Sequence, residues 1–200
     1  AAEAALDRVF TDLRQRLPDT PLRVVSGMAD GADRIVVRVA LRHQLLVTAL
    51  LPMPLHEYAA DFSASSLAEL QEILAQPGVE QIELPIPPAL QSPGAPLGPA
   101  ARDELYHRLA ACLTRKSNVI LALWDGVSTG LVGGTSQVLL RFLHALPEPD
   151  AALQPVTFVA AAPGDTSGPE FACWIPMRRA GNGDRESLPA REQFLSGGLG

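Results

Sequence analysis

Cysteine is scarce in this sequence: there are two among 200 residues, Cys112 and Cys173. Two cysteines are too few for a disulfide scaffold, and their separation is not that of a zinc site. His56, His107 and His144 also lie far apart with no shared spacing, so the sequence predicts no metal centre. Cys112 falls on the apolar side of a predicted helix, where we expect it to be a core residue.

Long apolar runs and a signal peptide are also lacking. No run approaches the roughly 20 apolar residues that cross a bilayer as a helix. With 47% hydrophobic residues, the chain has enough apolar side chains to fill the core of one globular domain. The default expectation is therefore a cytoplasmic protein.

An excess of positive charge is lacking as well. The chain has 16 Lys and Arg against 22 Asp and Glu, which gives a net charge of −6. Proteins that bind nucleic acid usually carry a basic face, whereas the basic residues here are scattered and form no aromatic-basic groove for single strands. The sequence therefore does not predict a general nucleic-acid-binding protein.

The most informative stretch is V-V-S-G-M-A-D-G-A-D, residues 24–33. A β-branched run ends in Ser-Gly, and a helical pattern follows, which predicts a sharp turn from a buried strand into a helix. Gly27 and Gly31 can adopt positive φ and have no Cβ to block a ligand. The N–H groups at the helix start would form an anion site, although the spacing is neither G-x-G-x-x-G nor a P-loop. Helix capping by Asp30 is the alternative explanation.

The rest of the chain alternates predicted helices with predicted strands. The predicted helices cover residues 2–17, 31–43, 55–62, 65–76, 101–116 and 135–146. The predicted strands cover residues 22–26, 45–51, 79–84, 119–124 and 155–162, with 79–84 at an edge. This alternation predicts an α/β fold of Rossmann-like type, with a mostly parallel sheet and helices on both faces.

We expect a single domain over residues 1–162, followed by a tail or linker over residues 163–200. The tail is rich in Gly, Pro, Arg and Ser without a clear period, which predicts poor order. The chain begins at Ala1 and enters a helix directly, whereas an α/β fold normally feeds such a helix from a strand. We therefore expect that a first strand is missing and that this sequence is a piece of a longer protein.

Two predicted loops leave the carboxyl ends of strands and are rich in glycine, Ser26–Asp33 and Asp125–Thr135. Ligands of parallel α/β sheets bind beyond these strand ends, so we expect both loops to face one ligand crevice. In the second loop, Gly133 and Gly134 would let the backbone approach an anion, and Thr135 would offer a hydroxyl. The alternative is an ordinary helix cap after a flexible loop.

These residues resemble a known family. S-G-M-A-D-G-A-D-R at residues 26–34 is similar to the S-G-x-A-x-G-A-D-R motif of SLOG domains. SLOG domains are Rossmann-like proteins related to the lonely-guy phosphoribohydrolases, to the DNA-processing protein DprA and to the N-terminal region of TRPM channels. The resemblance covers about residues 5–160 and continues at Leu51-Pro52, Glu57-Tyr58, Asp61-Phe62, Leu123–Gly126 and Gly133–Thr135. The strand and glycine turn with which the family usually starts are absent from this chain.

The resemblance implies a sensor that binds a nucleotide or nucleotide-derived ligand, such as an ADP-ribose derivative or a cyclic nucleotide. In the family such a ligand often switches a fused or partner effector in prokaryotic antiviral defence. Asp125 would accept hydrogen bonds from ribose hydroxyls, unless it only forms an Asp-Gly turn. The expected ligand-binding residues are Ser26, Gly27, Met28, Asp30, Gly31, Asp33, Asp125, Gly126, Gly133, Gly134 and Thr135.

A segment after the second predicted strand is a candidate lid over the crevice. Glu57 and Asp61 are four residues apart and would share a helix face, either as an acid–base pair or as a solvated pair. Tyr58 could stack on a base, and core packing is its alternative role.

The chain lacks the catalytic residue of the enzymes that it resembles. The phosphoribohydrolases carry G-G-x-G-T-x-x-E, and the position of this Glu reads Val138 here, beside Gln137. A neutral side chain cannot act as a general base, so the resemblance implies ligand binding without catalytic residues. Three alternatives stay open: a phosphoribohydrolase, DNA handling, and a degenerate structural or interaction domain. We also expect a homo-oligomer and no resident cofactor besides the nucleotide-derived ligand.

Overall fold

The computed structural model describes residues 2–91, 96–125, 134–135, 138–139, 171–177 and 193–196. The chain divides into two compact units, essentially Glu3–Leu113 and Thr114–Gly200. The prediction of one domain over residues 1–162 stays a prediction. The boundary falls inside a helix, and no proline- or glycine-rich linker marks it in the sequence.

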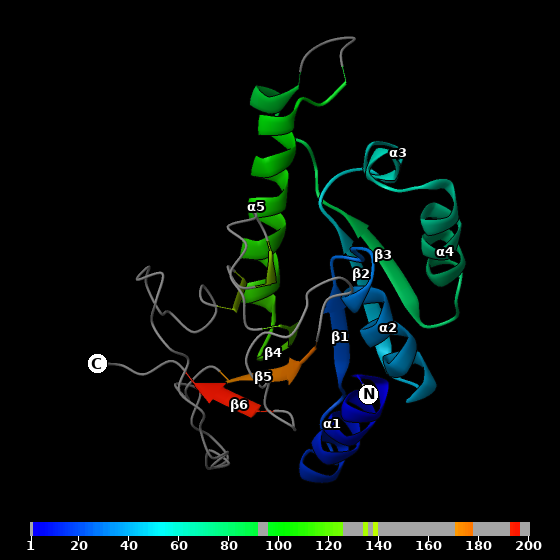
Figure 1. The fold of residues 1–200 in the computed structure, drawn as a ribbon, viewed down its shortest axis with the longest axis vertical. Coiled ribbons are helices and arrows are strands. Elements are labelled where there is room, and N and C mark those ends of the chain that lie inside the picture. Colours follow the sequence, from blue (N-terminus) through cyan, green and yellow to red (C-terminus); the bar gives the residue numbers. More distant parts are fainter. Residues whose placement is uncertain are drawn as a thin grey trace. The chain divides into compact units, whose positions relative to one another are not determined.

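The first unit contains a sheet of three parallel strands, β1 (Arg23–Ser26), β2 (Leu46–Leu51) and β3 (Val79–Glu83), in the order β1-β2-β3 (Figure 1). The central strand β2 is buried over most of its length, as its uninterrupted apolar sequence predicted. The strand β3 pairs with β2 and is largely exposed, in agreement with the predicted edge strand. Because all three strands are parallel, their carboxyl ends meet at one edge of the sheet.

Helices connect these strands. Their bounds are α1 (Ala2–Arg16), α2 (Ala32–Arg42), α3 (Leu55–Tyr58), α4 (Ala64–Leu74) and α5 (Pro99–Lys116), with the 3₁₀ turns η1 (Ala59–Asp61) and η2 (Pro88–Leu90). In the first unit, α2 and α4 lie on one side of the sheet and α5 lies on the other (Figure 1). The helix α1 buries Leu6 together with Val9 and Phe10, which follow it by three and four residues and so lie on the same helical face.

The second unit contains β4 (Val119–Trp124), β5 (Phe171–Pro176) and β6 (Gln193–Ser196). The strand β5 pairs with β4 in parallel and with β6 in antiparallel orientation. Both β5 and β6 lie inside the span 163–200, so the expectation of an unstructured tail is wrong for these two segments. Phe171-Ala-Cys-Trp-Ile is a short apolar run, and pairing with β4 stabilises it as a strand despite the surrounding glycines and prolines.

The predicted α/β class with parallel strands is confirmed, and each predicted element up to residue 124 is present with ends shifted by one or two residues. The predicted strand 155–162 and most of the predicted helix 135–146 lie outside the described residues. At the start of that helix, the Val138 N–H donates to the Gly134 carbonyl at 3.1 Å. No helix in the described ranges is long and apolar enough to cross a membrane.

Candidate functional site

The β1–α2 loop, residues 27–31, makes the predicted sharp turn between strand and helix. Gly31 has a φ of 87°, as expected, and Met28 also has a positive φ, 62°. A non-glycine residue adopts this conformation only where its surroundings hold it there. The Met28 side chain is completely buried, and its N–H donates to the Ser26 hydroxyl at 3.2 Å. Burial of the side chain therefore offsets the cost of this backbone conformation.

The φ of Gly27 is not positive, so this part of the prediction is wrong, and the expected ligand contact of Gly27 stays a prediction. Its lack of a side chain serves packing against α5. A Cβ on Gly27 would lie 2.9 Å from Cδ2 of Leu109 on α5, closer than real Cβ contacts allow. Glycine therefore lets α5 approach the end of β1.

The N-terminus of α2 has no side-chain cap. Gly31 is the N-cap residue, and because glycine has no side chain, the N-cap position supplies no hydrogen bond to the first turn. The alternative in which Asp30 caps the helix is wrong: the Asp30 carboxylate lies 3.5 Å from Nη1 of Arg34, and its side chain is 65% exposed. Since the first N–H groups of a helix need partners, an uncapped start next to a glycine is a favourable place for an anion.

Asp33 joins the first turn of α2 to the loop. Its Oδ2 accepts a hydrogen bond from the Ala29 N–H at 3.2 Å. Burial raises the pKa of the Asp33 carboxyl above its usual value of 3.8, although the Ala29 N–H and the Ser26 hydroxyl act in the opposite direction. Asp33 is thus a positioning group for the loop backbone as well as a candidate contact for a ligand.

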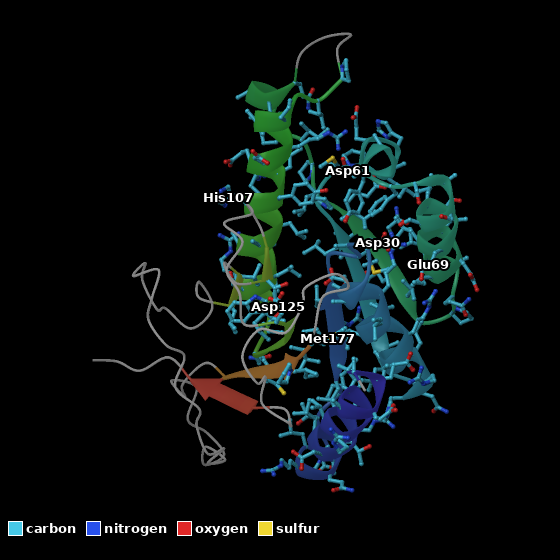
Figure 2. All side chains as sticks on the ribbon, in the orientation of Figure 1. Asp30, Asp61, Glu69, His107, Asp125 and Met177 are labelled. Atoms are coloured by element: carbon cyan, nitrogen blue, oxygen red, sulfur yellow. The ribbon has the colours of Figure 1, made fainter. Side chains whose placement is uncertain are left out.

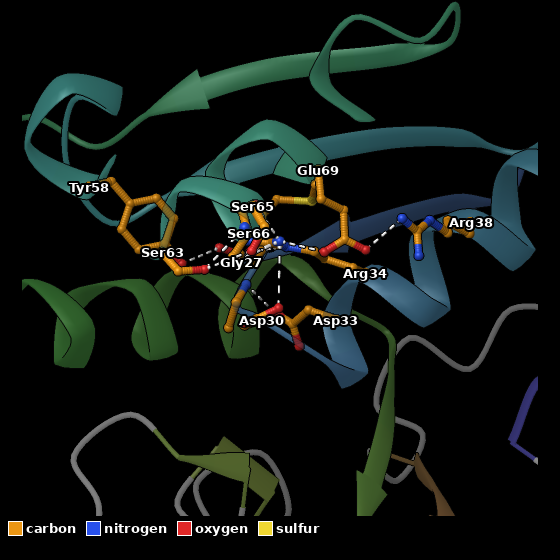
Figure 3. A network of polar contacts seen from close by, with 12 residues as sticks. Gly27, Asp30, Asp33, Arg34, Arg38, Tyr58, Ser63, Ser65, Ser66 and Glu69 are labelled. Carbon is orange, nitrogen blue, oxygen red and sulfur yellow. Dashed lines mark hydrogen bonds and ion pairs between the residues drawn. The ribbon is translucent and has the colours of Figure 1, made fainter. Parts of the chain in front are cut away.

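Arg34 is the buried centre of the polar contacts around the loop (Figure 3). Its side chain is 1% exposed, and Nη1 donates to the Ser66 carbonyl at 2.7 Å and to Glu69 at 2.8 Å. Its Nε donates to the Met28 carbonyl at 3.4 Å, and its guanidinium lies 4.9 Å from the centre of the Phe62 ring. Arg34 therefore ties the loop to α4.

Arg34 ends the S-G-M-A-D-G-A-D-R motif, and the motif predicted no role for its side chain. Its spacing of three residues from Val37 on the apolar side of α2 was an available signal of burial. Its main partner, Glu69, is 35 residues away, and no sequence pattern links the two. Contact with Arg34, and next with Arg38, lowers the pKa of the Glu69 carboxyl below its usual value of 4.5.

Tyr58 packs in the core rather than offering a ring for base stacking. Its side chain is 2% exposed, and its hydroxyl donates to the Gly27 carbonyl at 3.1 Å. The ring meets Phe62 edge-on with centroids 4.7 Å apart, and it meets Tyr106 at 6.3 Å. Burial raises the pKa of the Tyr58 hydroxyl, so Tyr58 stays neutral and donates this hydrogen bond.

Glu57 and Asp61 do share a face, and they meet a cation there. Both Asp61 oxygens lie 2.9 Å from Nη1 of Arg102, and Glu57 lies 3.7 Å from Nη2. The Tyr106 hydroxyl donates to Asp61 at 2.7 Å. Burial, followed by this bond to Asp61, raises the pKa of Tyr106. The carboxylates are neither a solvated pair nor an isolated acid–base pair, and their contacts attach the candidate lid to α5.

The remaining predicted residues belong to the second unit. Asp125 directly follows β4 and is partly exposed (Figure 2). Gly134 precedes a helical turn that includes exposed Thr135. Gly126 and Gly133 lie outside the described residues. The expectation that this loop and the β1–α2 loop share a crevice stays a prediction.

Two further features bear on the choice of site. The described part of the chain has no cluster of three or more His, Cys, Asp or Glu that could hold a metal ion. A shallow hollow of about 300 Å³ is lined by Asp7, Arg8, Thr11, Asp12 and Gln15. All five residues belong to α1, and none of them lies in a stretch that the sequence predicted to bind a ligand.

Comparison of the chain with protein-family models, with curated proteins and with solved structures finds no match in any of the three. The fold and the geometry of the β1–α2 loop assign the protein to a structural class. It is an α/β protein whose first described parallel strand runs through a glycine-containing turn into the N-terminus of a helix, and this turn is buried at Gly27 and Met28 and exposed from Ala29 to Gly31.

Proposed function

We propose that this chain binds a nucleotide or nucleotide-derived ligand at the β1–α2 loop and acts as a sensor for a fused or partner effector. The observation that carries the proposal is the uncapped N-terminus of α2 at the carboxyl end of β1. Ligands of parallel α/β sheets bind beyond this end of the strands, and phosphates bind at helix N-termini. The resemblance of residues 26–34 to SLOG domains supports the same function and suggests an ADP-ribose derivative or a cyclic nucleotide.

The rigidity of the loop adds support. The buried residues Met28 and Arg34, together with the partly exposed Asp33, hold the loop backbone through contacts that do not involve a ligand. A loop that is ordered before binding loses little conformational entropy on binding, which favours affinity.

Ligand binding without turnover is the better supported form of the proposal. Val138 occupies the position of the phosphoribohydrolase glutamate. Two candidate replacements, Glu57 and Asp61, both contact Arg102 and are therefore not free carboxylates. A place in antiviral defence and assembly into homo-oligomers belong to the same proposal and rest on the resemblance alone.

The test measures thermal stabilisation by AMP, NAD, ADP-ribose, cyclic ADP-ribose isomers and cyclic dinucleotides. A ligand present at about 100 times its dissociation constant stabilises the folded chain by roughly 2.7 kcal/mol. The informative variant is Ala32→Asp in the first turn of α2. It adds a negative charge that the helix tolerates but that repels a bound phosphate.

Ala32→Asn is the matched control, because it has the same shape without the charge. We expect Ala32→Asp to abolish the ligand-induced shift and Ala32→Asn to keep most of it. The proposal fails if no ligand shifts the wild-type chain, or if both variants bind as the wild type does. Release of ribose 5-phosphate from a nucleoside monophosphate would instead identify an enzyme.

A further inference from the structure

We propose that Tyr58 is a positioning residue for the β1–α2 loop: its hydroxyl orients the Gly27–Met28 peptide and connects the loop to the packing of α5. This inference deepens the proposed function and rests on it for the identity of the site. The positioning itself is a property of the free protein and can be measured without a ligand.

The hydroxyl of Tyr58 sets the direction of one peptide plane. It donates to the Gly27 carbonyl at 3.1 Å within the buried interior (Figure 3). In a planar trans peptide the C=O and the N–H point in opposite directions. The Met28 N–H therefore points away from Tyr58, and it donates to the Ser26 hydroxyl at 3.2 Å. Tyr58 thus holds the Gly27–Met28 peptide with its N–H toward the Ser26 hydroxyl, next to the residues that we expect to contact the ligand.

Arg34 does the same for the next peptide. Its Nε donates to the Met28 carbonyl at 3.4 Å, and the opposing Ala29 N–H donates to Asp33 at 3.2 Å. The carbonyls of two consecutive peptides therefore accept hydrogen bonds from the buried side chains of Tyr58 and Arg34. The N–H groups of the same two peptides point toward Ser26 and Asp33. This arrangement explains how Met28 is held at a φ of 62°.

The position of Tyr58 depends in turn on α5. Arg102 and Tyr106 both bind Asp61, which follows Tyr58 by three residues. Leu109, one turn further along the same face of α5, packs where a Cβ of Gly27 would stand. Positions i, i+4 and i+7 of one helix thus contact the segment that carries Tyr58 and the glycine that it bonds.

The neighbouring rings complete this connection. Tyr58 meets Phe62 edge-on, and the guanidinium of Arg34 lies over the same Phe62 ring. The two side chains that orient the loop carbonyls are therefore packed against a common partner. A change in the position of α3 and η1 on α5 would move Tyr58, and with it the Gly27 carbonyl.

The experiment compares Tyr58→Phe with Tyr106→Phe in the full chain. Each variant loses one hydroxyl from the same layer of rings, but only Tyr58 bonds the loop. Hydrogen exchange at the Met28 and Ala29 amides is measured relative to amides in β2. We expect about fivefold faster exchange in Tyr58→Phe, which corresponds to about 1 kcal/mol for the lost hydrogen bond. Tyr106→Phe leaves the Tyr58 hydroxyl and both Arg102–Asp61 bonds in place, so it should change these two amides by less than twofold.

Titration with ADP-ribose then tests the link to binding. In a wild-type chain that binds ADP-ribose, Tyr58→Phe should weaken the affinity about fivefold, at a temperature where both chains are folded. Unchanged exchange at Met28 and Ala29 in Tyr58→Phe would overturn the inference. So would an equal rise in β2, because Tyr58 would then contribute only global stability. Faster loop exchange in a chain that binds none of the nucleotide probes would support the positioning role and refute the proposed function.

Discussion

Arg34 shows how much of this site depends on one buried side chain. A guanidinium that is 1% exposed has lost its hydration, and the Ser66 carbonyl and the Glu69 carboxylate replace it. Within the described part of the chain, Nη2 of Arg34 has no hydrogen-bond partner, so its other contacts offset the whole cost of burial. Arg34 is therefore sensitive to the loss of any one partner.

Glu69→Gln tests this at the residue scale. We expect the variant to lose about 2 kcal/mol of unfolding free energy, because removal of the carboxylate leaves a buried cation under-compensated. The effect stays below that of a fully buried pair, since the Glu69 side chain is 29% exposed. Urea denaturation at pH 7 measures the loss, and Glu72→Gln, an exposed position on the same helix, should stay within about 0.5 kcal/mol of the wild type.

The same comparison has a predicted dependence on pH. The pKa of Glu69 is lowered in the folded state, so its contribution to stability is present above its usual value of 4.5 and is lost as the pH falls through the lower, folded value. The difference between the wild type and Glu69→Gln should therefore shrink as the pH falls below 4.5. A difference that stays constant down to acid pH would contradict the ion-pair explanation.

At the scale of elements, the contact between β1 and α5 depends on the absence of one methyl group. Gly27→Ala would place its Cβ 2.9 Å from Cδ2 of Leu109 and force this side chain to move. We expect a loss of about 1–3 kcal/mol from overpacking. Thermal and urea unfolding would measure it.

Leu109→Ala provides the double-mutant test of this contact. Alone it should be destabilising, because it opens a cavity beside a buried position. Combined with Gly27→Ala, it removes the clash, so the double variant should be more stable than the sum of the single effects predicts by about 1 kcal/mol. Strict additivity would show that the two residues do not meet.

At the scale of the whole molecule, the division into two units falls within α5, between Leu113 and Thr114. A continuous helix at this boundary carries the chain from the unit with the β1–α2 loop into the unit with β4, β5 and β6. In the proposed sensor, α5 would be the covalent connection between the unit that binds the ligand and the second unit.

The charge of the whole chain leads to a prediction about partners. With a net charge of −6, we expect no salt-dependent binding of a labelled single-stranded oligonucleotide in fluorescence anisotropy at 0.15 M salt. A nucleic-acid-binding protein loses affinity steeply as salt rises. Binding of that kind would favour the DNA-handling alternative over the nucleotide sensor.

Local patterns determined much of this protein. The apolar run of β2, the helical stripe of α1 and the strand–glycine–helix transition at residues 23–42 are properties of neighbouring residues, so the sequence alone predicted the α/β class and the place of the candidate site. The positive φ of Gly31 followed in the same way, because glycine has the lowest cost there.

Only the tertiary structure decided the contacts between residues far apart in the chain. Arg34 with Glu69, Tyr58 with Gly27, and Asp61 with Arg102 are separated by 35, 31 and 41 positions. Pairing with β4 likewise made a strand of residues 171–176 in a segment whose composition indicated a linker. In each case the stabilising partner is brought close by folding, and no periodicity in the sequence records it.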